Sequence, residues 1–341
     1  MLKSYLQLLM DKPYLTRDEA EAAMTIIVNE TDPHQTAAFL AILKYRGETP
    51  GEVAGMVAAL QKKALPVNLH FSVLDIVGTG GDLANTVNIS TGSAILAAAC
   101  GIPIAKHGNR SVSSRSGSAD VLEELGIDLE ASPEQLTHYL REVGIAFMFA
   151  PTYHPSLKKL ASIRKGLKLP TVFNILGPLL NPAKAEYALI GVANESTLEL
   201  MSQVILQFGN KKRTFLFHGS GLDELTTLEK IIAYDIQNGQ MNRLEVDPTS
   251  LDFSSCSLEE LQGGDAKLNA SILKNVFAGQ QGAVADALIF NAGAAVWIFG
   301  KTTTLEEGIQ VARKALKEGK ALEVLEKWVA LSKQLKLQRK T

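Results

Sequence analysis

Residues 73–82, Val-Leu-Asp-Ile-Val-Gly-Thr-Gly-Gly-Asp, place a short apolar run directly before a glycine-rich turn. The run 73–77 is typical of a buried strand, because it is apolar except for Asp75. Glycines adopt positive φ and let a ligand approach the backbone, and successive N–H groups in such a turn can bind an anion. The spacing matches neither a Walker A loop nor a GxGxxG dinucleotide fingerprint. A turn without a ligand is an equally good interpretation of this stretch alone.

Short apolar runs recur after residue 72 and are separated by segments with helical periodicity. Gly126 and Gly144 end two of the intervening helices. The alternation predicts an α/β fold with a mostly parallel central sheet flanked by helices. Ligands of such sheets bind beyond the carboxyl ends of the strands. Further strands are expected at 102–105, 145–149, 188–192 and 214–217, with an added hairpin within 230–250.

The N-terminal region has helix signals and no strand pattern. Capping boxes begin helices after Thr16 and Thr49, and the helix over 36–46 has an apolar face that must be buried. That face packs either within its own domain or against a partner. Residues 266–340 return to helix, with a Lys-rich end after Lys333 that is expected to fray. We therefore predict a small helical domain over 1–65 and an α/β domain over 70–341.

Composition limits the class of protein. The chain has 341 residues, of which 46% are hydrophobic and 21% charged, as in ordinary globular proteins. Its net charge of −2 gives no reason to expect binding to nucleic acid or to a membrane. Cys100 and Cys256 have neither metal-ligand nor disulfide spacing, and no apolar stretch reaches the ~20 residues of a membrane helix. Because the first residues also lack a signal-peptide core, we expect a cytoplasmic protein.

A second polar stretch, residues 106–120, gathers three cations with serines and glycines. It offers no face to bury, so we predict a loop beyond the strand that ends at residue 105. Lys106, Arg110, Arg115 and the backbone N–H groups can wrap a polyanion, although an exposed polar loop is the alternative. The helix that begins at residues 88–91 would present further free N–H groups to a phosphate.

Five motifs occur in the order found in anthranilate phosphoribosyltransferases, and the chain resembles that family from its N-terminal helices to about residue 300. Two positions depart from the pattern: Leu169-Pro170-Thr171 replaces an expected Arg-Thr pair, and Leu180 replaces a Thr. The motifs are 78–82 (Gly-Thr-Gly-Gly-Asp), 88–91 (Asn-Ile-Ser-Thr), 106–109 (Lys-His-Gly-Asn), 118–126 (Ser-Ala-Asp-Val-Leu-Glu-Glu-Leu-Gly) and 173–182 (Phe-Asn-Ile-Leu-Gly-Pro-Leu-Leu-Asn-Pro).

The resemblance implies a reaction. The phosphoribosyl group of phosphoribosyl pyrophosphate is transferred to the amine of anthranilate, giving N-(5-phosphoribosyl)anthranilate and pyrophosphate. This is the second step of tryptophan biosynthesis from chorismate. The resemblance further implies a fold like that of class II nucleoside phosphorylases, Mg²⁺, a homodimer formed through the helical domain, and a return of residues near 165–185 to that domain.

Two alternatives stay open at this stage. A pyrimidine nucleoside phosphorylase-like enzyme would share the fold and the glycine-rich loop, but it has a different basic loop. A non-catalytic relative that binds nucleic acid would show a surplus of basic residues, which a net charge of −2 does not provide.

The resemblance also assigns site residues. Asp223 and Glu224, which follow the strand 214–217, would bind Mg²⁺, since Mg²⁺ prefers oxygen ligands, and the Ser90 hydroxyl would bind a second Mg²⁺. A helix-capping Asp on a solvated turn is the alternative. The arginine of residues 162–166 would pair with the carboxylate of anthranilate. The anthranilate residues are Gly78, Asn109, His154, Arg164 and Gly177, and the catalytic candidates are His107 and Arg164.

The remaining assignments concern phosphoribosyl pyrophosphate. Residues of the two loops and of the helix start between them would contact its phosphates and ribose. They are Gly78, Gly81, Asp82, Thr86, Asn88, Ile89, Ser90, Thr91, Lys106, His107, Gly108, Asn109, Arg110, Ser111, Val112, Ser113, Ser114 and Ser118.

Overall fold

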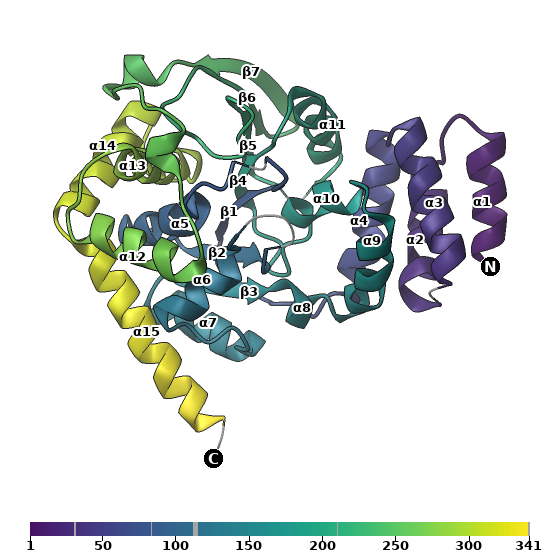
Figure 1. The fold of residues 1–341 in the computed structure, drawn as a ribbon, viewed down its shortest axis with the longest axis horizontal. Coiled ribbons are helices and arrows are strands. Elements are labelled where there is room, and N and C mark those ends of the chain that lie inside the picture. The colour runs from purple at the N-terminus through teal and green to yellow at the C-terminus, as the bar shows by residue number, and fades with distance from the viewer. Residues whose placement is uncertain (31, 83, 112–114, 210, 340–341) are drawn as a thin grey trace.

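A computed structural model describes residues 1–30, 32–82, 84–111, 115–209 and 211–339. Figure 1 shows a larger α/β part beside a lobe of helices. The lobe contains α1 (Leu2–Asp11), α2 (Arg17–Asn29), α3 (Pro33–Arg46) and α4 (Pro50–Lys63). The predicted capping boxes begin α2 at Thr16 and α4 at Thr49. The predicted fold class, a helical domain with a mostly parallel α/β domain, is confirmed.

The central sheet has seven strands in the order β3-β2-β1-β4-β5-β6-β7. The first five are parallel to one another, and the hairpin β6-β7 adds two antiparallel strands at one edge. All predicted strands are present. Their bounds are β1 (Leu74–Gly78), β2 (Ile104–Gly108), β3 (Ile145–Phe149), β4 (Tyr187–Gly191), β5 (Arg213–His218), β6 (Ile231–Gln237) and β7 (Gln240–Val246).

Helices connect the strands and cover the sheet. Between β1 and β4 these are α5 (Ile89–Ala99), α6 (Ser118–Leu125), α7 (Pro133–Glu142), α8 (Ala150–Tyr153), η1 (Pro155–Leu160), α9 (Ala161–Leu167), α10 (Phe173–Leu176) and η2 (Gly177–Leu179). After β4 they are α11 (Glu195–Leu206), η3 (Pro248–Leu251), η4 (Glu259–Leu261), α12 (Ala266–Phe277), α13 (Ala283–Ile298), α14 (Leu305–Lys317) and α15 (Lys320–Gln338).

The two faces of the sheet belong to two hydrophobic clusters, because successive side chains of a strand point to opposite faces. On β4, Leu189 packs with α5 and α13, whereas Ala188 and Ile190 pack with α11 and the helical lobe. The lobe is therefore attached to the sheet through a shared apolar cluster. Residues of α9, α10 and η2, including Ile163, Phe173 and Leu179, belong to that same cluster. The domain limits themselves stay a prediction.

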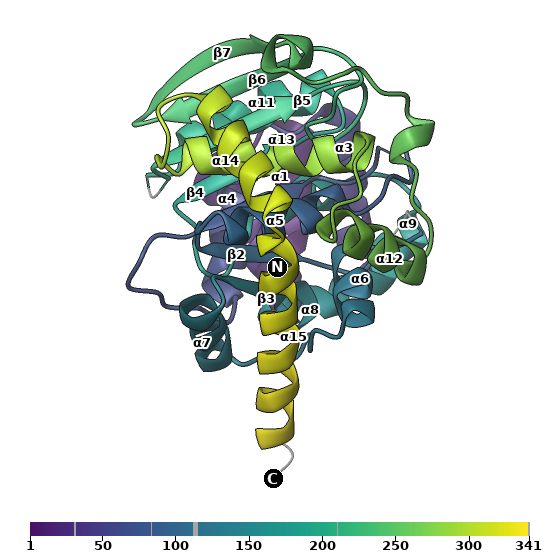
Figure 2. The ribbon, with the colours of Figure 1, turned by 90° about the vertical axis from the view of Figure 1, so that its left-hand side faces the viewer.

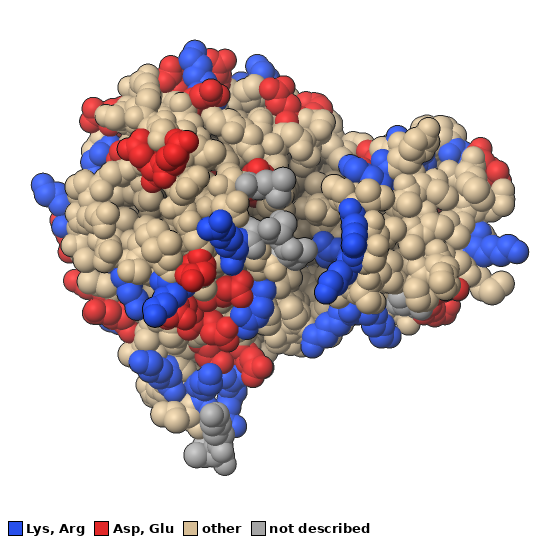
Figure 3. All heavy atoms as spheres, in the orientation of Figure 1, with Lys and Arg blue, Asp and Glu red and all other residues tan. Residues whose placement is uncertain are grey.

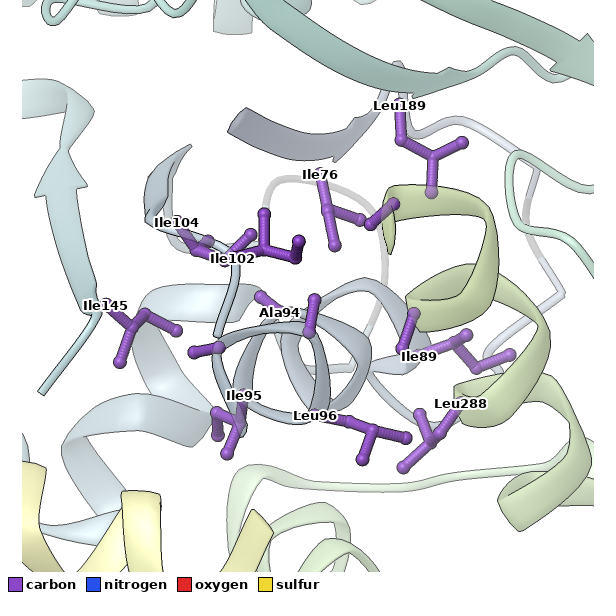
Figure 4. Packing of buried hydrophobic residues seen from close by; sticks show 14 of the residues in the cluster. Ile76, Ile89, Ala94, Ile95, Leu96, Ile102, Ile104, Ile145, Leu189 and Leu288 are labelled. Atoms are coloured by element: carbon purple, nitrogen blue, oxygen red, sulfur yellow. The ribbon is translucent and has the colours of Figure 1, made fainter. Parts of the chain in front are cut away.

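Helix α5 lies in the middle of the other cluster. Figure 4 shows Ala94 on the side of α5 toward the strand residues Ile76 and Ile104, with Leu96 on its other side beside Leu288 of α13. Nine of its eleven residues are buried, so the helix has no solvent-facing side along most of its length. This burial fixes the start of α5 firmly at the carboxyl edge of the sheet.

Two sequence-based expectations are wrong. Strand β2 does not end at residue 105 but continues to Gly108, so Lys106 and His107 are buried strand residues rather than loop residues. The C-terminal helix does not fray after Lys333 but continues to Gln338, because Leu335 is buried and its carbonyl accepts a bond from Gln135 Nε2 at 3.3 Å. Figure 2 shows α15 running along the α/β part and projecting beyond it.

Candidate active site

The candidate site lies where the order of the strands reverses, between β1 and β4. Parallel α/β sheets bind ligands beyond the carboxyl ends of the strands at this point. Gly78 ends β1, Gly191 ends β4, and the segment after β5 folds over both. Thr79 N–H donates to Gly191 O at 3.0 Å and joins the ends of the two strands.

Asp223 fills this crevice. Its Oδ2 accepts a bond from the N–H of Gly80 at 2.6 Å, and Gly80 and Gly81 both have positive φ, as predicted for a glycine-rich turn. A Cβ at Gly78 would clash with the Asp223 carboxylate, and one at Gly191 would clash with its backbone. Both strands must therefore end in glycine for Asp223 to reach its position.

Three carboxylates meet at this point. Oxygen atoms of Asp82, Asp223 and Glu224 all lie within 4.8 Å of one another, and Glu224 Oε2 is buried without a hydrogen-bond partner among the described residues. Burial, followed by the charge of Asp82, raises the pKa of Asp223 to about 6. Burial, followed by the charges of Asp223 and Asp82, raises the pKa of Glu224 well above its usual value. The charge of Lys106 lowers the pKa of Glu224 but does not outweigh burial and the two neighbouring carboxylates.

A divalent cation fits this cluster. Mg²⁺ is bound by carboxylate oxygens and keeps several waters, so three converging carboxylates with one orphaned oxygen suit it. The structure thus brings Asp223 and Glu224 together and adds Asp82, which the sequence analysis placed only among the phosphate contacts. Ser90 Oγ accepts a bond from Lys106 Nζ at 3.3 Å. The metal role of Ser90 stays a prediction.

Lys106 supplies the nearest cation. Its Nζ donates to Ile76 O at 2.6 Å and to Ser90 Oγ, which leaves one of its three N–H groups for another acceptor. Burial lowers the pKa of Lys106 to about 8, against the opposing effect of Asp75, Glu224 and Asp223. A phosphate at the third N–H would add another anion and favour the charged form.

The start of α5 faces the same edge. Asn88 occupies the N-cap position, but its side chain does not cap the helix. Thr91 Oγ1 is buried and has no partner among the described residues, although a buried hydroxyl normally has one. An uncapped helix start with an orphaned hydroxyl is suited to a phosphate. The flanking residues Ile89 and Thr86 are fixed by burial of the former and by a bridge from the latter to Gln262.

The segment that leads from β2 to α6, here called the basic loop, is partly neutralised by carboxylates of α6. Arg110 Nη1 lies 2.8 Å from both Asp120 and Glu123, so its charge is shared with α6. Asp120 also accepts the N–H of Ser111 at 3.1 Å and of Gly117 at 2.9 Å. Ser118 begins α6, as predicted. Val112, Ser113 and Ser114, assigned to phosphoribosyl pyrophosphate, lie outside the described residues.

Two buried histidines stand on the side of the site toward the lobe. His107 Nδ1 lies 3.3 Å from Gly177 O, and His154 Nε2 lies 2.7 Å from Leu180 O. Since a carbonyl only accepts, these nitrogens carry the protons and His107 Nε2 and His154 Nδ1 are acceptors, both buried and without a partner among the described residues. Burial lowers the pKa of each histidine to about 4. Both are therefore neutral at pH 7.

Arg164 lies on the lobe. Its guanidinium stands 5.2 Å from the ring centroid of Phe173, and among the described residues no carboxylate forms an ion pair with it. Figure 3 shows a hollow between the lobe and the α/β part, with Lys and Arg side chains on both sides. Gly177 has free space in front of it, and Asn109 is exposed beyond β2. Of the positions that depart from the family pattern, Leu169 is exposed, whereas Leu180 is buried and offers its carbonyl to His154.

Other features lie away from this edge. A cavity of about 680 Å³, lined by residues of 66–73, 182–186 and 209–212, lies at the amino ends of β1, β4 and β5. None of the helices in the described part of the chain is both long and apolar enough to cross a membrane.

Fold and site define a class of protein. Residues 3–64 match the helical bundle domain of the glycosyl transferase family, and residues 70–322 match its a/b domain. The anthranilate phosphoribosyltransferase of Chlamydia felis is 72% identical over 339 residues, which are 99% of each chain. That of Bacillus thuringiensis is 41% identical over 341 residues, again 99% of each. The chain belongs to the anthranilate phosphoribosyltransferase family.

Solved structures agree with this assignment. The anthranilate phosphoribosyltransferase from Thermus thermophilus superimposes with a TM-score of 0.91 at 38% identity, covering 97% of this chain and 99% of that one. The Saccharomyces cerevisiae protein in complex with PRPP and Mg gives a TM-score of 0.89 at 26% identity, with 98% of each chain covered. The resemblance found in the sequence is confirmed, and these relatives do not support the phosphorylase or the nucleic-acid-binding alternative.

Sequence reasoning missed three residues of the site. Asp75 is buried and accepts bonds from His107 N–H at 3.1 Å and from Asn181 Nδ2 at 2.7 Å. Asn269 donates to Asn88 Oδ1 at 2.8 Å. A charged residue within an apolar strand, as Asp75 is, was the available signal for the first. Asn181 belongs to the motif 173–182, but the sequence assigned it no role. Nothing in the local sequence around Asn269 indicates that this residue belongs to the site.

Replacement of Gly191 tests how closely Asp223 packs against the end of β4. G191A is expected to lower the free energy of unfolding by about 2 kcal/mol, because the new methyl group overlaps the Asp223 backbone. Unfolding in urea measures the loss. The matched control is G51A on α4, where a Cβ meets no atom within 4 Å, and it should change stability by about 0.5 kcal/mol at most. Equal stability of the two variants would contradict the close packing.

The carboxylate cluster predicts a response to Mg²⁺ that depends on pH. A folded-state pKa above the unfolded value means that the contribution of Asp223 to stability is present below about pH 4 and is lost as the pH rises through about 6. Mg²⁺ competes with these protons, so it should raise the melting temperature more at pH 7.5 than at pH 5.5. The expected difference is about 2 °C. D223N should abolish the response, and an equal response at both pH values would exclude the metal assignment.

Proposed function

We propose that this chain transfers the phosphoribosyl group of phosphoribosyl pyrophosphate to the amine of anthranilate at the edge between β1 and β4. The bond from the anomeric carbon to pyrophosphate breaks, a bond from that carbon to the amine nitrogen forms, and the amine releases a proton. The observation that carries the proposal is the meeting of three carboxylates, a buried lysine and an uncapped helix start around one crevice. Family membership supports the same reaction.

The residues of the crevice serve the leaving group. Asp82, Asp223 and Glu224 would hold Mg²⁺, and the ion would supply positive charge against the charge that develops on pyrophosphate. The yeast relative was solved with PRPP and Mg. Lys106 and the start of α5 donate to phosphate oxygens. The turn at Gly80 and Gly81 lets the backbone approach the ligand. Asn109, Gly108 and Ser118 lie where the basic loop leaves β2 and enters α6.

The residues toward the lobe serve the acceptor. The amine of anthranilate is neutral at pH 7, so orientation matters more than a strong base. His107 Nε2 and His154 Nδ1 are buried acceptors without a partner among the described residues, and they can accept hydrogen bonds from this amine. Arg164 has no carboxylate partner among the described residues. Its guanidinium can therefore bind the carboxylate of anthranilate through two parallel N–H···O bonds. A yeast relative was solved in complex with 4-fluoroanthranilate.

The test is the loss of anthranilate fluorescence when the purified protein meets anthranilate, phosphoribosyl pyrophosphate and Mg²⁺. The proposed function requires a decay that depends on all three. Absence of decay although phosphoribosyl pyrophosphate binds would exclude anthranilate as the acceptor.

Arg164 gives a sharper test of the acceptor site. R164A is expected to raise the KM for anthranilate at least about tenfold, the effect of losing about 1.4 kcal/mol of charge-assisted hydrogen bonding, and to leave the KM for phosphoribosyl pyrophosphate unchanged. K165A, which removes an exposed charge from the same helix, is the control and should match the wild type. Equal increases in both KM values would exclude Arg164 as the carboxylate ligand.

We also propose that the protein acts in the cytoplasm as a homodimer formed through the helical lobe. Large apolar side chains of the lobe are exposed, among them Met10, Tyr14 and Tyr45 with exposed fractions of 60%, 57% and 94%. Leu40 and Leu43 of α3 are buried within the chain, so the predicted apolar face of this helix is only partly available.

Sedimentation velocity tests the dimer. The wild type should sediment as a dimer at micromolar concentration, and the triple variant M10S/Y14S/Y45S should sediment as a monomer. The control L337S removes an exposed leucine at the opposite end of the chain and should leave the dimer intact. A monomeric wild type would refute the proposal.

A further inference from the structure

A chain of side-chain amides connects three segments around the phosphate end of the site. Gly264 N–H donates to Asn269 Oδ1 at 2.7 Å, Asn269 Nδ2 donates to Asn88 Oδ1 at 2.8 Å, and Asn88 Nδ2 donates to Ser116 O at 3.1 Å. The backbone N–H at one end and the carbonyl at the other fix the orientation of both amides. Asn269 is 1% exposed, so its bonds do not compete with water.

These hydrogen bonds between side-chain amides change the role of Asn88. Asparagine at an N-cap position normally accepts an N–H of the first helical turn through its side-chain oxygen, as Asn194 does for Thr197 at the start of α11. The side-chain oxygen of Asn88 instead accepts from Asn269, and α5 has no side-chain cap. Ile89 N–H donates to Val87 O at 2.6 Å and Thr91 N–H donates to Asn88 O at 3.1 Å. Ser90 N–H is therefore the donor of the first turn of α5 that has no acceptor among the described residues.

The support for Asn269 is rigid. Backbone bonds join Val87 N–H to Leu261 O at 2.9 Å and Gly263 N–H to Asn85 O at 3.0 Å, so residues 261–263 bracket the approach to α5. A Cβ at Gly263 would collide with Asn269 Oδ1 and with the Val87 backbone. Figures 1 and 2 show α12, which bears Asn269, beside α6.

At its other end, the series of hydrogen bonds reaches the basic loop. Ser116, whose carbonyl accepts from Asn88, precedes Gly117 at the N-cap of α6. The Asn88 amide therefore sets the spacing between the starts of α5 and α6, the two helix starts at the phosphate side of the crevice.

We propose that Asn269 is a positioning residue for phosphoribosyl pyrophosphate: by holding the side-chain oxygen of Asn88, it keeps this residue from capping α5 and reserves the helix start for a substrate phosphate. The inference rests on the proposed function, since that function supplies the ligand. Asn269 acts through Asn88 and does not itself contact the substrate.

The first variant is N269D, which is nearly isosteric. The carboxylate still accepts from Gly264 N–H, but it cannot donate to Asn88 Oδ1. We expect the Kd for phosphoribosyl pyrophosphate with Mg²⁺, measured by titration calorimetry, and the corresponding KM to rise about tenfold, whereas the KM for anthranilate stays within about twofold. N275A, which replaces an exposed asparagine of the same helix, is the matched control and should bind as the wild type does.

The second variant, N88S, separates positioning from a merely structural role. The serine introduced there is a good N-cap and cannot span the distance to both Asn269 and Ser116. We expect the melting temperature to stay the same or rise while the affinity for phosphoribosyl pyrophosphate falls about tenfold. N88S also decides the matter if N269D does not fold. In the double variant N88S/N269D, the second change should add less than about twofold to the Kd.

Several results would overturn the inference: wild-type affinity of N269D or N88S, equal increases in the KM values of both substrates, or effects of the two substitutions that multiply. Failure of the proposed function has a different signature. A wild type that binds phosphoribosyl pyrophosphate without consuming anthranilate would refute the proposed function alone, and the calorimetric comparison would still test Asn269. A wild type that does not bind phosphoribosyl pyrophosphate would refute both.

Discussion

The buried carboxylate of Asp75 is the interaction on which the rest of the site depends. Strands β1 and β2 share one residue pair in register, Leu74 with Ile104. Beyond it, His107 N–H donates to the Asp75 side chain and Lys106 Nζ donates to Ile76 O, so side chains take over where the backbone ladder stops. Burial raises the pKa of Asp75, while the nearby charges of Lys106 and Lys211 and the bond from Asn181 act against this rise. The carboxylate thus links β1 to β2 and offsets the charge of a buried lysine.

The same carboxylate connects the two halves of the site. Asn181 Nδ2 donates both to Asp75 and to Ala105 O at 2.8 Å, which fixes the segment that returns from the lobe. That segment presents the carbonyls of Gly177 and Leu180, and these set the tautomers of His107 and His154. The phosphate side is rigid through α5 and the acceptor side through Asn181, and both are anchored on one buried anion.

The sequence predicts the local elements well and the long-range partners poorly. The strand 145–149, the capping boxes at Thr16 and Thr49 and the start of α6 follow from neighbours in the chain, and the structure has them at those residues. The burial of Lys106 does not follow, because its compensation by Ile76 and Asp75 depends on strand pairing. Asn269 lies 181 residues from Asn88, and Asp82 joins Asp223 only across the crevice between β1 and β4. The substrates and the metal were predicted from the resemblance of the motifs to a known family, because hydrophobic periodicity predicts only helices and strands.

The uncapped start of α5 makes the substrate a part of the secondary structure. Some helices of this chain are capped by their own side chains, as α2 is by Thr16, whereas α5, like α13 and α15, has no side-chain cap. Helix α5, enclosed on nearly all sides by the core, would be completed by an external phosphate. The free energy of substrate binding then includes that of giving an acceptor to Ser90 N–H, the first-turn donor that has none among the described residues. Compounds that imitate a helix cap would form a class of inhibitors distinct from those that imitate a sugar or an aromatic amine.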